Sequence, residues 1–211
     1  MKTIGFLGAG RLAQMLAKKA AKAGWKVILS NSRGPETLTE LTQGMEGDVS
    51  AATPSEMVRE ADIVVLAIRW PHLSDATAGV DWSGKIVIDA MNNRLGPKPE
   101  DLIEIGNVLS SDVVASHLPG ARLVKAFNHE PIPVFDKVLP PQGDANVLFL
   151  AGSDAEANAR VAGLMKDLGA EPIDLGPINQ GGKLIGMGGP LTNKMKLFSL
   201  ADAKAAIAAS H

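Results

Sequence analysis

The first residues with recognisable chemistry form a glycine-rich turn near the start of the sequence. The segment Gly8-Ala9-Gly10-Arg11-Leu12-Ala13 follows the apolar run Thr3–Leu7 and opens a helical pattern. This order matches the fingerprint G-x-G-x-x-G/A, in which the first glycine permits a tight turn and the second lets the backbone approach a pyrophosphate. The helix N-terminus adds unpaired N–H groups and a positive dipole. The sequence therefore predicts a dinucleotide-binding turn rather than a simple glycine-rich connection.

A second group of residues bears on which dinucleotide is bound. An NAD site would place Asp or Glu at the end of the second strand, about 20 residues beyond the turn, to accept hydrogen bonds from the ribose. This chain has Ser30-Asn31-Ser32-Arg33 there, whose hydroxyl, amide and guanidinium groups can donate to a 2′-phosphate and match its charge. The segment favours NADP(H). Two alternatives stay open: Arg33 in an ordinary surface turn, or Glu36 as the acceptor for NAD, although Glu36 suits the first turn of the next helix.

Further candidates follow the other predicted strands, because ligands of parallel α/β sheets lie outside the carboxyl ends of the strands. Ile68 or Trp70 could flank the adenine or the ribose, and Arg69 lies between them. Asn92 and Asn128 could orient the nicotinamide carboxamide, with Ala126 beside the second of them. The same residues could instead cap loops.

One residue, His129, is a candidate for acid–base assistance. Hydride transfer between bound cofactors needs little proton chemistry from the protein, so a missing catalytic dyad is no contradiction. His129 follows the fifth predicted strand and could polarise or protonate an acceptor; the alternative is an ordinary loop histidine before Glu130-Pro131. The four histidines lack metal-ligand spacing and no G-x-S-x-G motif occurs, so we expect neither a metal site nor a serine nucleophile.

The elements that must position these residues alternate between apolar strands and helices. Short runs rich in Val and Ile suit strands that crossover helices bury on both faces. We predict a Rossmann-type, doubly wound, mostly parallel α/β sheet with helices on both faces and a short C-terminal extension. The length of 211 residues favours one domain, 1–211, with a dinucleotide-binding core at 1–128 and an extension at 129–211 that completes the sheet and the acceptor site. The predicted strands are 3–7, 26–29, 62–68, 85–89, 123–127, 146–151 and 171–175; helices are expected at 12–23, 37–45, 54–59, 73–79 and 112–117, after Ser153 with Glu156 as a capping box, and at 200–209, and a turn at 140–143.

Composition excludes several classes of protein. The chain carries 21 basic and 23 acidic residues, a net charge of −2, which gives no reason to expect nucleic acid as a partner. It contains no cysteine, and no apolar stretch reaches the length of about 18 residues that suggests a membrane span. We expect a soluble, cytoplasmic enzyme with no membrane partner.

Four segments together resemble the NADPH-dependent coenzyme F420 reductases. They are Gly8-Ala9-Gly10-Arg11-Leu12, Asn31-Ser32-Arg33-Gly34-Pro35, Leu66-Ala67-Ile68-Arg69-Trp70 and Lys125-Ala126-Phe127-Asn128. The resemblance covers most of roughly the first 175 residues. The first motif is shared by many dehydrogenases, whereas the second and fourth segments are more specific to this family. Enzymes of the family it resembles pass a hydride between the nicotinamide and a stacked deazaflavin.

The resemblance also implies roles for individual residues. Ser32 and Arg33 would hold the 2′-phosphate, the run from Ala9 to Leu12 the pyrophosphate, and Ala126 to Asn128 would lie near the nicotinamide. The turn after the third strand and the glycine-rich segment 181–190 depart from the family pattern, and the latter should border the second substrate. That segment is either a lid over a flat acceptor or a structural turn.

These observations leave several functions open. The leading one is an NADP(H)-dependent oxidoreductase whose small-molecule acceptor is coenzyme F420 or a similar flat molecule. Alternatives are a reductase of another acceptor (an imine, a flavin or a ferric complex) and a non-catalytic NADP(H) redox sensor. We further expect a homodimer in which the C-terminal segment closes the site.

Overall fold

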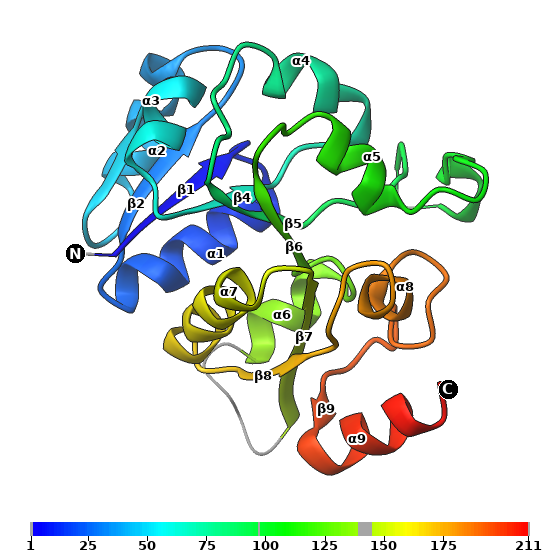
Figure 1. The fold of residues 1–211 in the computed structure, drawn as a ribbon. Helices are drawn as coiled ribbons and strands as arrows, with labels where there is room; N and C mark the ends of the chain where they lie inside the picture. Colours follow the sequence, from blue (N-terminus) through cyan, green and yellow to red (C-terminus); the bar gives the residue numbers. More distant parts are fainter. Residues whose placement is uncertain (1, 97, 139–144, 211) are drawn as a thin grey trace. The chain divides into compact units, whose positions relative to one another are not determined.

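The computed structural model describes residues 2–96, 98–138 and 145–210 and divides into two compact units (Figure 1). Unit 1 is Met1–Arg122 and unit 2 is Leu123–His211. The predicted limit of the dinucleotide-binding core at residue 128 lies close to this division. That 1–211 forms a single domain stays a prediction.

Unit 1 contains five parallel strands in the order β3-β2-β1-β4-β5. Every residue of β1, β4 and β5 is buried, as expected for Val- and Ile-rich parallel strands that are covered on both faces. The strands are β1 (Thr3–Leu7), β2 (Lys26–Ser30), β3 (Val49–Ala51), β4 (Ile63–Leu66) and β5 (Ile86–Asp89).

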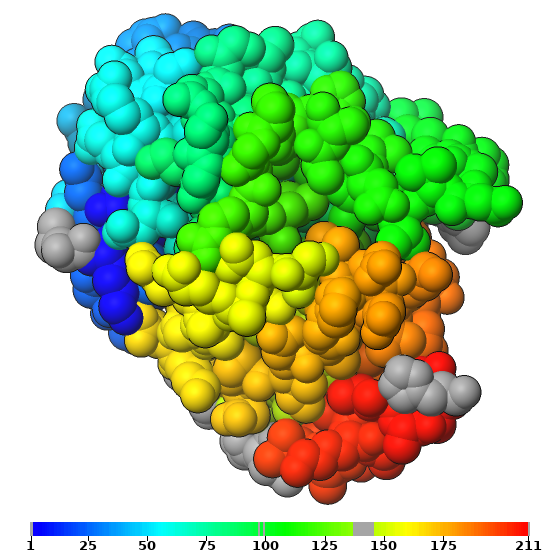
Figure 2. Space-filling model, in the orientation of Figure 1, coloured from blue at the N-terminus to red at the C-terminus, as the bar shows by residue number. Residues whose placement is uncertain are grey.

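Helices α1 (Arg11–Lys22) and α3 (Pro54–Glu60) lie on opposite faces of β1 and β2 (Figure 1). Gly5 permits the close approach of α3, because a Cβ there would collide with the side chain of Met57. The remaining helices of unit 1 are short: η1 (Pro35–Leu38), α2 (Thr39–Gln43), η2 (Trp70–His72), α4 (Leu73–Thr77), η3 (Pro99–Asp101) and α5 (Ser110–Ser116). The segment between β5 and α5 extends outward from the rest of unit 1 (Figure 2), and its Leu95, Leu102 and Val108 are exposed to solvent.

Unit 2 is built around the long strand β7 (Ala145–Gly152). It pairs antiparallel with β6 (Arg122–Ala126) and β9 (Phe198–Ser199) and parallel with β8 (Glu171–Asp174). Helices α6 (Ile132–Val138), α7 (Ala155–Asp167), α8 (Gly181–Ile185) and α9 (Leu200–Ala208) complete the unit. Its core cluster comprises Val147, Phe149, Ala151, Ile185, Leu191, Phe198 and Ala203.

The predicted fold class is confirmed: the structure is a Rossmann-like α/β fold with mostly parallel strand pairs. One local prediction was wrong. The cap of α7 is Asp154, whose carboxylate accepts from the N–H of Ala157 at 2.8 Å, and not Ser153. Sequence reasoning also missed the three-residue strand β3. The expected turn at 140–143 lies outside the described residues, and within the described ranges no helix is long and apolar enough to cross a membrane.

Candidate dinucleotide-binding site

The candidate site of unit 1 begins with the alignment of four strand ends. In the register of the sheet, Leu7 pairs with Ser30 of β2 and with Leu66 of β4, and Leu66 pairs with Asp89 of β5. The loops that follow these strands therefore leave the sheet at the same edge. The structure brings together there the predicted unit 1 residues Gly8, Ala9, Gly10, Arg11, Leu12, Asn31, Ser32, Arg33, Ile68, Arg69, Trp70 and Asn92.

Gly8 makes the tight turn that the fingerprint predicts. Its φ of +105° is in the region that only glycine adopts readily, and a Cβ there would lie 2.5 Å from the carbonyl oxygen of Ala67 and 2.9 Å from Cγ2 of Ile68. The N–H of Gly8 donates to the carbonyl of Ser30 at 2.9 Å, and the Ser30 hydroxyl donates to the carbonyl of Phe6 at 3.0 Å. The turn is therefore fixed between β2 and β4.

Gly10 faces open space at the start of α1. It is the N-cap residue with extended φ and ψ, it is exposed, and a Cβ added there would meet no protein atom within 4 Å. No side chain caps α1 and no acidic residue lies in its first turn, whereas Thr53 and Ser199 cap α3 and α9. The first-turn N–H groups of α1 thus remain available to an anion, which fits a pyrophosphate.

The turn after β2 presents two side chains that can donate hydrogen bonds. The Oδ1 of Asn31 accepts from the N–H of Arg33 at 2.9 Å, and its Nδ2 donates to Oγ1 of Thr37 at 2.9 Å. The Asn31 amide therefore shapes the turn. Ser32 and Arg33 are exposed, and neither side chain bonds to another described residue. Glu36 lies in the first turn of η1, as expected, so no acidic residue stands at the end of β2 itself.

The loops after β4 and β5 complete this edge of unit 1. The side chain of Ile68 lies beside Gly8, Arg69 is exposed, and the half-buried Trp70 begins η2. Asn92 is half-buried in the loop after β5.

Sequence reasoning missed Asp89 as an organiser of the loop after β5. The fully buried carboxylate accepts from the Ser111 hydroxyl at 2.8 Å and from the N–H of Met91 at 3.0 Å. The available signal was an acidic residue that ends an otherwise apolar strand.

The remaining predicted residues, Ala126, Asn128 and His129, belong to unit 2. Ala126 ends β6 and is buried. Phe127 follows with a φ of +58°, an uncommon backbone conformation for a bulky residue. The amide of Asn128 donates to the carbonyl of Ile185 at 2.6 Å, which links the end of β6 to α8.

His129 occupies the core of unit 2. Its side chain is 2% exposed, its ring centroid lies 5.3 Å from that of Phe135 and 5.5 Å from that of Phe149, and neither ring nitrogen has a hydrogen-bond partner in the described part of the chain. Burial lowers the pKa of His129 to about 3, so the ring is neutral at pH 7. These surroundings favour a structural histidine, and the catalytic role stays a prediction.

Glu130, also missed by sequence reasoning, anchors the segment before β9. Its carboxylate oxygens accept from the N–H groups of Lys194 and Met195 at 2.6 and 2.8 Å. Burial raises the pKa of Glu130, and these two hydrogen bonds oppose the shift. Asn193 and Met195, on either side of Lys194, have positive φ angles that turn the backbone N–H groups toward the carboxylate.

The glycine-rich segment 181–190 packs closely within unit 2. A Cβ at Gly181 would lie 2.6 Å from Cβ of Leu175, and one at Gly189 would collide with the carbonyl oxygen of Lys183. Among the residues that the structure describes, no group of three His, Asp or Glu side chains could hold a metal ion.

Comparison with known proteins identifies related chains. Residues 3–93 match a family model described as "NADP oxidoreductase coenzyme F420-dependent". A hypothetical protein, SMa0349 of Sinorhizobium meliloti, is 35% identical, with a TM-score of 0.84 over 94% of this chain and 96% of that chain. A protein described as an F420-dependent NADP-reductase of Arthrobacter sp. FB24 shares the fold, with 24% identity and a TM-score of 0.68 over 85% of this chain and 86% of that chain.

The curated relatives are longer proteins. Metalloreductase STEAP2 of Homo sapiens is 25% identical over 184 residues, which cover 84% of this chain and 34% of the relative. The chain thus spans about a third of the length of the curated metalloreductases that it matches. The fingerprint turn and the loops after β2 and β4 all lie within residues 3–93, the segment that matches the family of NADP oxidoreductases described as coenzyme F420-dependent.

Proposed function

We propose that the protein is an NADP(H)-dependent oxidoreductase that transfers a hydride between NADPH and coenzyme F420 or a similarly flat acceptor. The observation that carries the proposal is the shared edge of unit 1, where Gly10 and the uncapped N-terminus of α1 adjoin the turn that presents Ser32 and Arg33. A pyrophosphate and a 2′-phosphate are the two anionic groups of NADP(H), and this edge offers donors for both.

Different residues of unit 1 would bind different groups of NADP(H). The backbone N–H groups from Gly10 into the first turn of α1 would bind the pyrophosphate, and the Arg33 guanidinium with the Ser32 hydroxyl would bind the 2′-phosphate. Ile68 and Trp70 would contact the adenine or the ribose. When bound, the nicotinamide supplies the hydride, so the protein's part is to hold the ring and exclude water.

Support for the deazaflavin acceptor comes from the family, whose description names coenzyme F420. A second acceptor class, ferric complexes, has support in the likeness to the metalloreductases over 84% of this chain. Reduction of a flavin and a non-catalytic sensor role are further outcomes of the test described below.

The test follows NADPH oxidation by its absorbance with coenzyme F420 and, in parallel, with FMN, FAD, ferric citrate and no acceptor. The proposal expects turnover with coenzyme F420 that greatly exceeds the other reactions. Fast turnover with ferric citrate alone would show that the acceptor is a ferric complex and not coenzyme F420. Tight NADPH binding without turnover on any acceptor would favour the sensor.

A further inference from the structure

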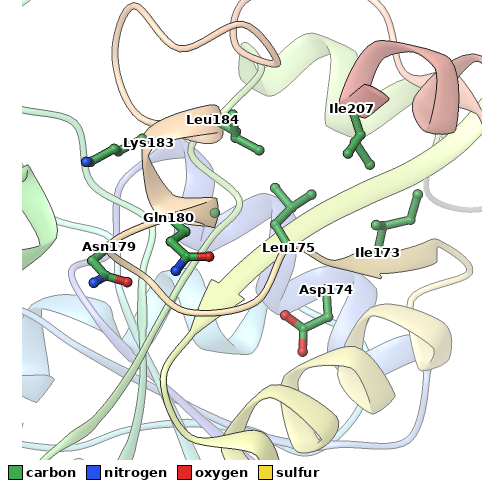
Figure 3. Close-up of a pocket in the computed structure, with 9 residues that line it drawn as sticks. Ile173, Asp174, Leu175, Asn179, Gln180, Lys183, Leu184 and Ile207 are labelled. Carbon is green, nitrogen blue, oxygen red and sulfur yellow. The ribbon is translucent and has the colours of Figure 1, made fainter. Parts of the chain in front are cut away.

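Unit 2 contains a cavity whose lining includes none of the residues assigned above to the dinucleotide. Its volume is about 540 Å³, and it lies between the end of β8, helix α8 and the C-terminal part of α9 (Figure 3). Pockets for small organic molecules commonly measure about 300–1,000 Å³. The cavity is therefore large enough for a ligand.

Four aliphatic side chains form the apolar part of the cavity: Ile173, Leu175, Leu184 and Ile207. They pack against the edge of the unit 2 core cluster and are only partly buried. An apolar ligand that covered them would remove this surface from water, which is favourable in proportion to the area buried.

The geometry of the cavity depends on a close contact between α8 and the end of β8. A Cβ on Gly181 would lie 2.6 Å from both Cβ and the carbonyl oxygen of Leu175, so only glycine lets the helix begin there. This contact sets the position of Lys183 and Leu184 on the short helix that follows. The cavity is thus built by packed backbone rather than by a loose surface loop.

Polar groups occupy one side of the cavity. Asn179, Gln180 and Lys183 lie on that side, opposite Ile173 and Ile207 (Figure 3). None of the three polar side chains bonds to another residue in the described part of the chain. Two amides and an ammonium group can therefore donate to an anionic head group.

The one carboxylate of the lining is already engaged elsewhere. Asp174 accepts from Nδ2 of Asn158 on α7 at 2.9 Å and from the N–H of Gly176 at 2.8 Å. These neutral donors leave the charge of Asp174 in place but hold its oxygens toward α7 and its own turn, and Lys183 supplies the cationic group of the lining.

We propose that this cavity binds a small amphipathic organic anion. A carboxylate or similar head group would contact Lys183, Asn179 and Gln180, and an aliphatic body would cover the apolar side chains. Because every lining residue belongs to unit 2, the site requires no dinucleotide, and its existence does not depend on the proposed function.

Isothermal titration calorimetry with octanoate tests the proposal, and octan-1-ol, with the same chain and no charge, is the matched ligand. We expect saturable one-to-one binding of octanoate and at least about fivefold weaker binding of octan-1-ol. Lys183→Gln should weaken octanoate binding by about five- to tenfold and leave octan-1-ol binding unchanged, because it removes the charge and keeps a polar side chain that is only one atom shorter.

Lys166→Gln is the control, since Lys166 is an exposed lysine of α7 outside the cavity lining. The control should bind octanoate as the unmodified protein does, and equal thermal unfolding midpoints would show that both variants are folded. Absence of saturable octanoate binding, or an equal loss of affinity in Lys166→Gln and Lys183→Gln, would overturn the proposal. Ile207→Asn, which makes the apolar side polar, should weaken both ligands; unchanged affinity for both would also contradict it.

Discussion

Replacing Gly10 by alanine separates binding from folding at the fingerprint turn. A Cβ at Gly10 meets no protein atom within 4 Å, and the φ of −76° with ψ of −176° is open to any residue. The stability cost is therefore limited to the poorer N-cap propensity of alanine, about 1 kcal/mol, partly offset by the lower entropy of the unfolded chain. The added methyl group does occupy the space through which a pyrophosphate would approach the backbone. We expect NADPH affinity to fall by about 2–3 kcal/mol, or roughly 30- to 150-fold.

Gly8→Ala is the contrasting variant. Its Cβ would lie 2.5 Å from the carbonyl oxygen of Ala67, at a φ of +105°. Strain and overlap should lower the free energy of unfolding by about 2 kcal/mol or more. Fluorescence titration with NADPH measures the affinities, and urea unfolding measures the stabilities.

Gly163→Ala controls for the introduction of a methyl group alone. Gly163 lies within α7 of unit 2, and a Cβ there also meets no atom within 4 Å. Alanine should stabilise this helix by up to about 1 kcal/mol and leave NADPH affinity unchanged. If Gly10→Ala binds NADPH as tightly as Gly163→Ala does, the pyrophosphate is not bound at the start of α1 and the reasoning is refuted.

Three further predictions address the specificity, the buried histidine and the assembly. Arg33→Ala should weaken NADPH binding by about 1.5–3 kcal/mol and leave NADH binding nearly unchanged; equal losses would mean that the 2′-phosphate is held elsewhere. Burial lowers the pKa of His129 to about 3, so as the pH falls this histidine takes up a proton in the unfolded chain before it does in the folded chain. The free energy of unfolding should therefore not depend on His129 above about pH 6.5, and should fall by about 1.4 kcal/mol per pH unit as the pH drops from there toward 3. In His129→Phe, urea unfolding between pH 7.5 and 5 should lack this slope, and retained turnover would exclude His129 as a proton donor. Sedimentation velocity should show a species of twice 22.0 kDa if the protein forms the predicted homodimer, and a single 22.0 kDa species would remove that prediction.

The sequence predicted the elements whose signals are strong and local. β1 matches its predicted range because a mostly apolar run precedes an obligatory turn, and α1 matches within a residue at each end because its apolar stripe repeats at helical spacing. β3 carries no such signal: its three residues, at the edge of the sheet, are all half-buried. At α7 two neighbouring residues could both cap the helix, and only the backbone path selects Asp154 over Ser153.

The parts of the candidate site that could be predicted are those in which a backbone turn or a charged side chain would bind the ligand. Gly8, Gly10 and Arg33 follow from what a dinucleotide requires of a turn. The surroundings of His129 did not follow, because Phe135 and Phe149 come from α6 and β7 and their packing depends on tertiary contacts. The cavity beside α8 was equally hidden, since its lining comes from β8, α8 and α9.

The carboxylate of Glu130 has a consequence for how the chain can be shortened. Its two donors are backbone N–H groups of residues 194 and 195, so any truncation that ends before them would leave a buried charge without hydrogen bonds. Such an uncompensated group costs several kcal/mol, a large fraction of the stability of an ordinary domain. Deletions from the C-terminus that reach Met195 also remove Phe198 and Ala203 from the core cluster, so they should yield aggregated protein in place of a smaller folded fragment.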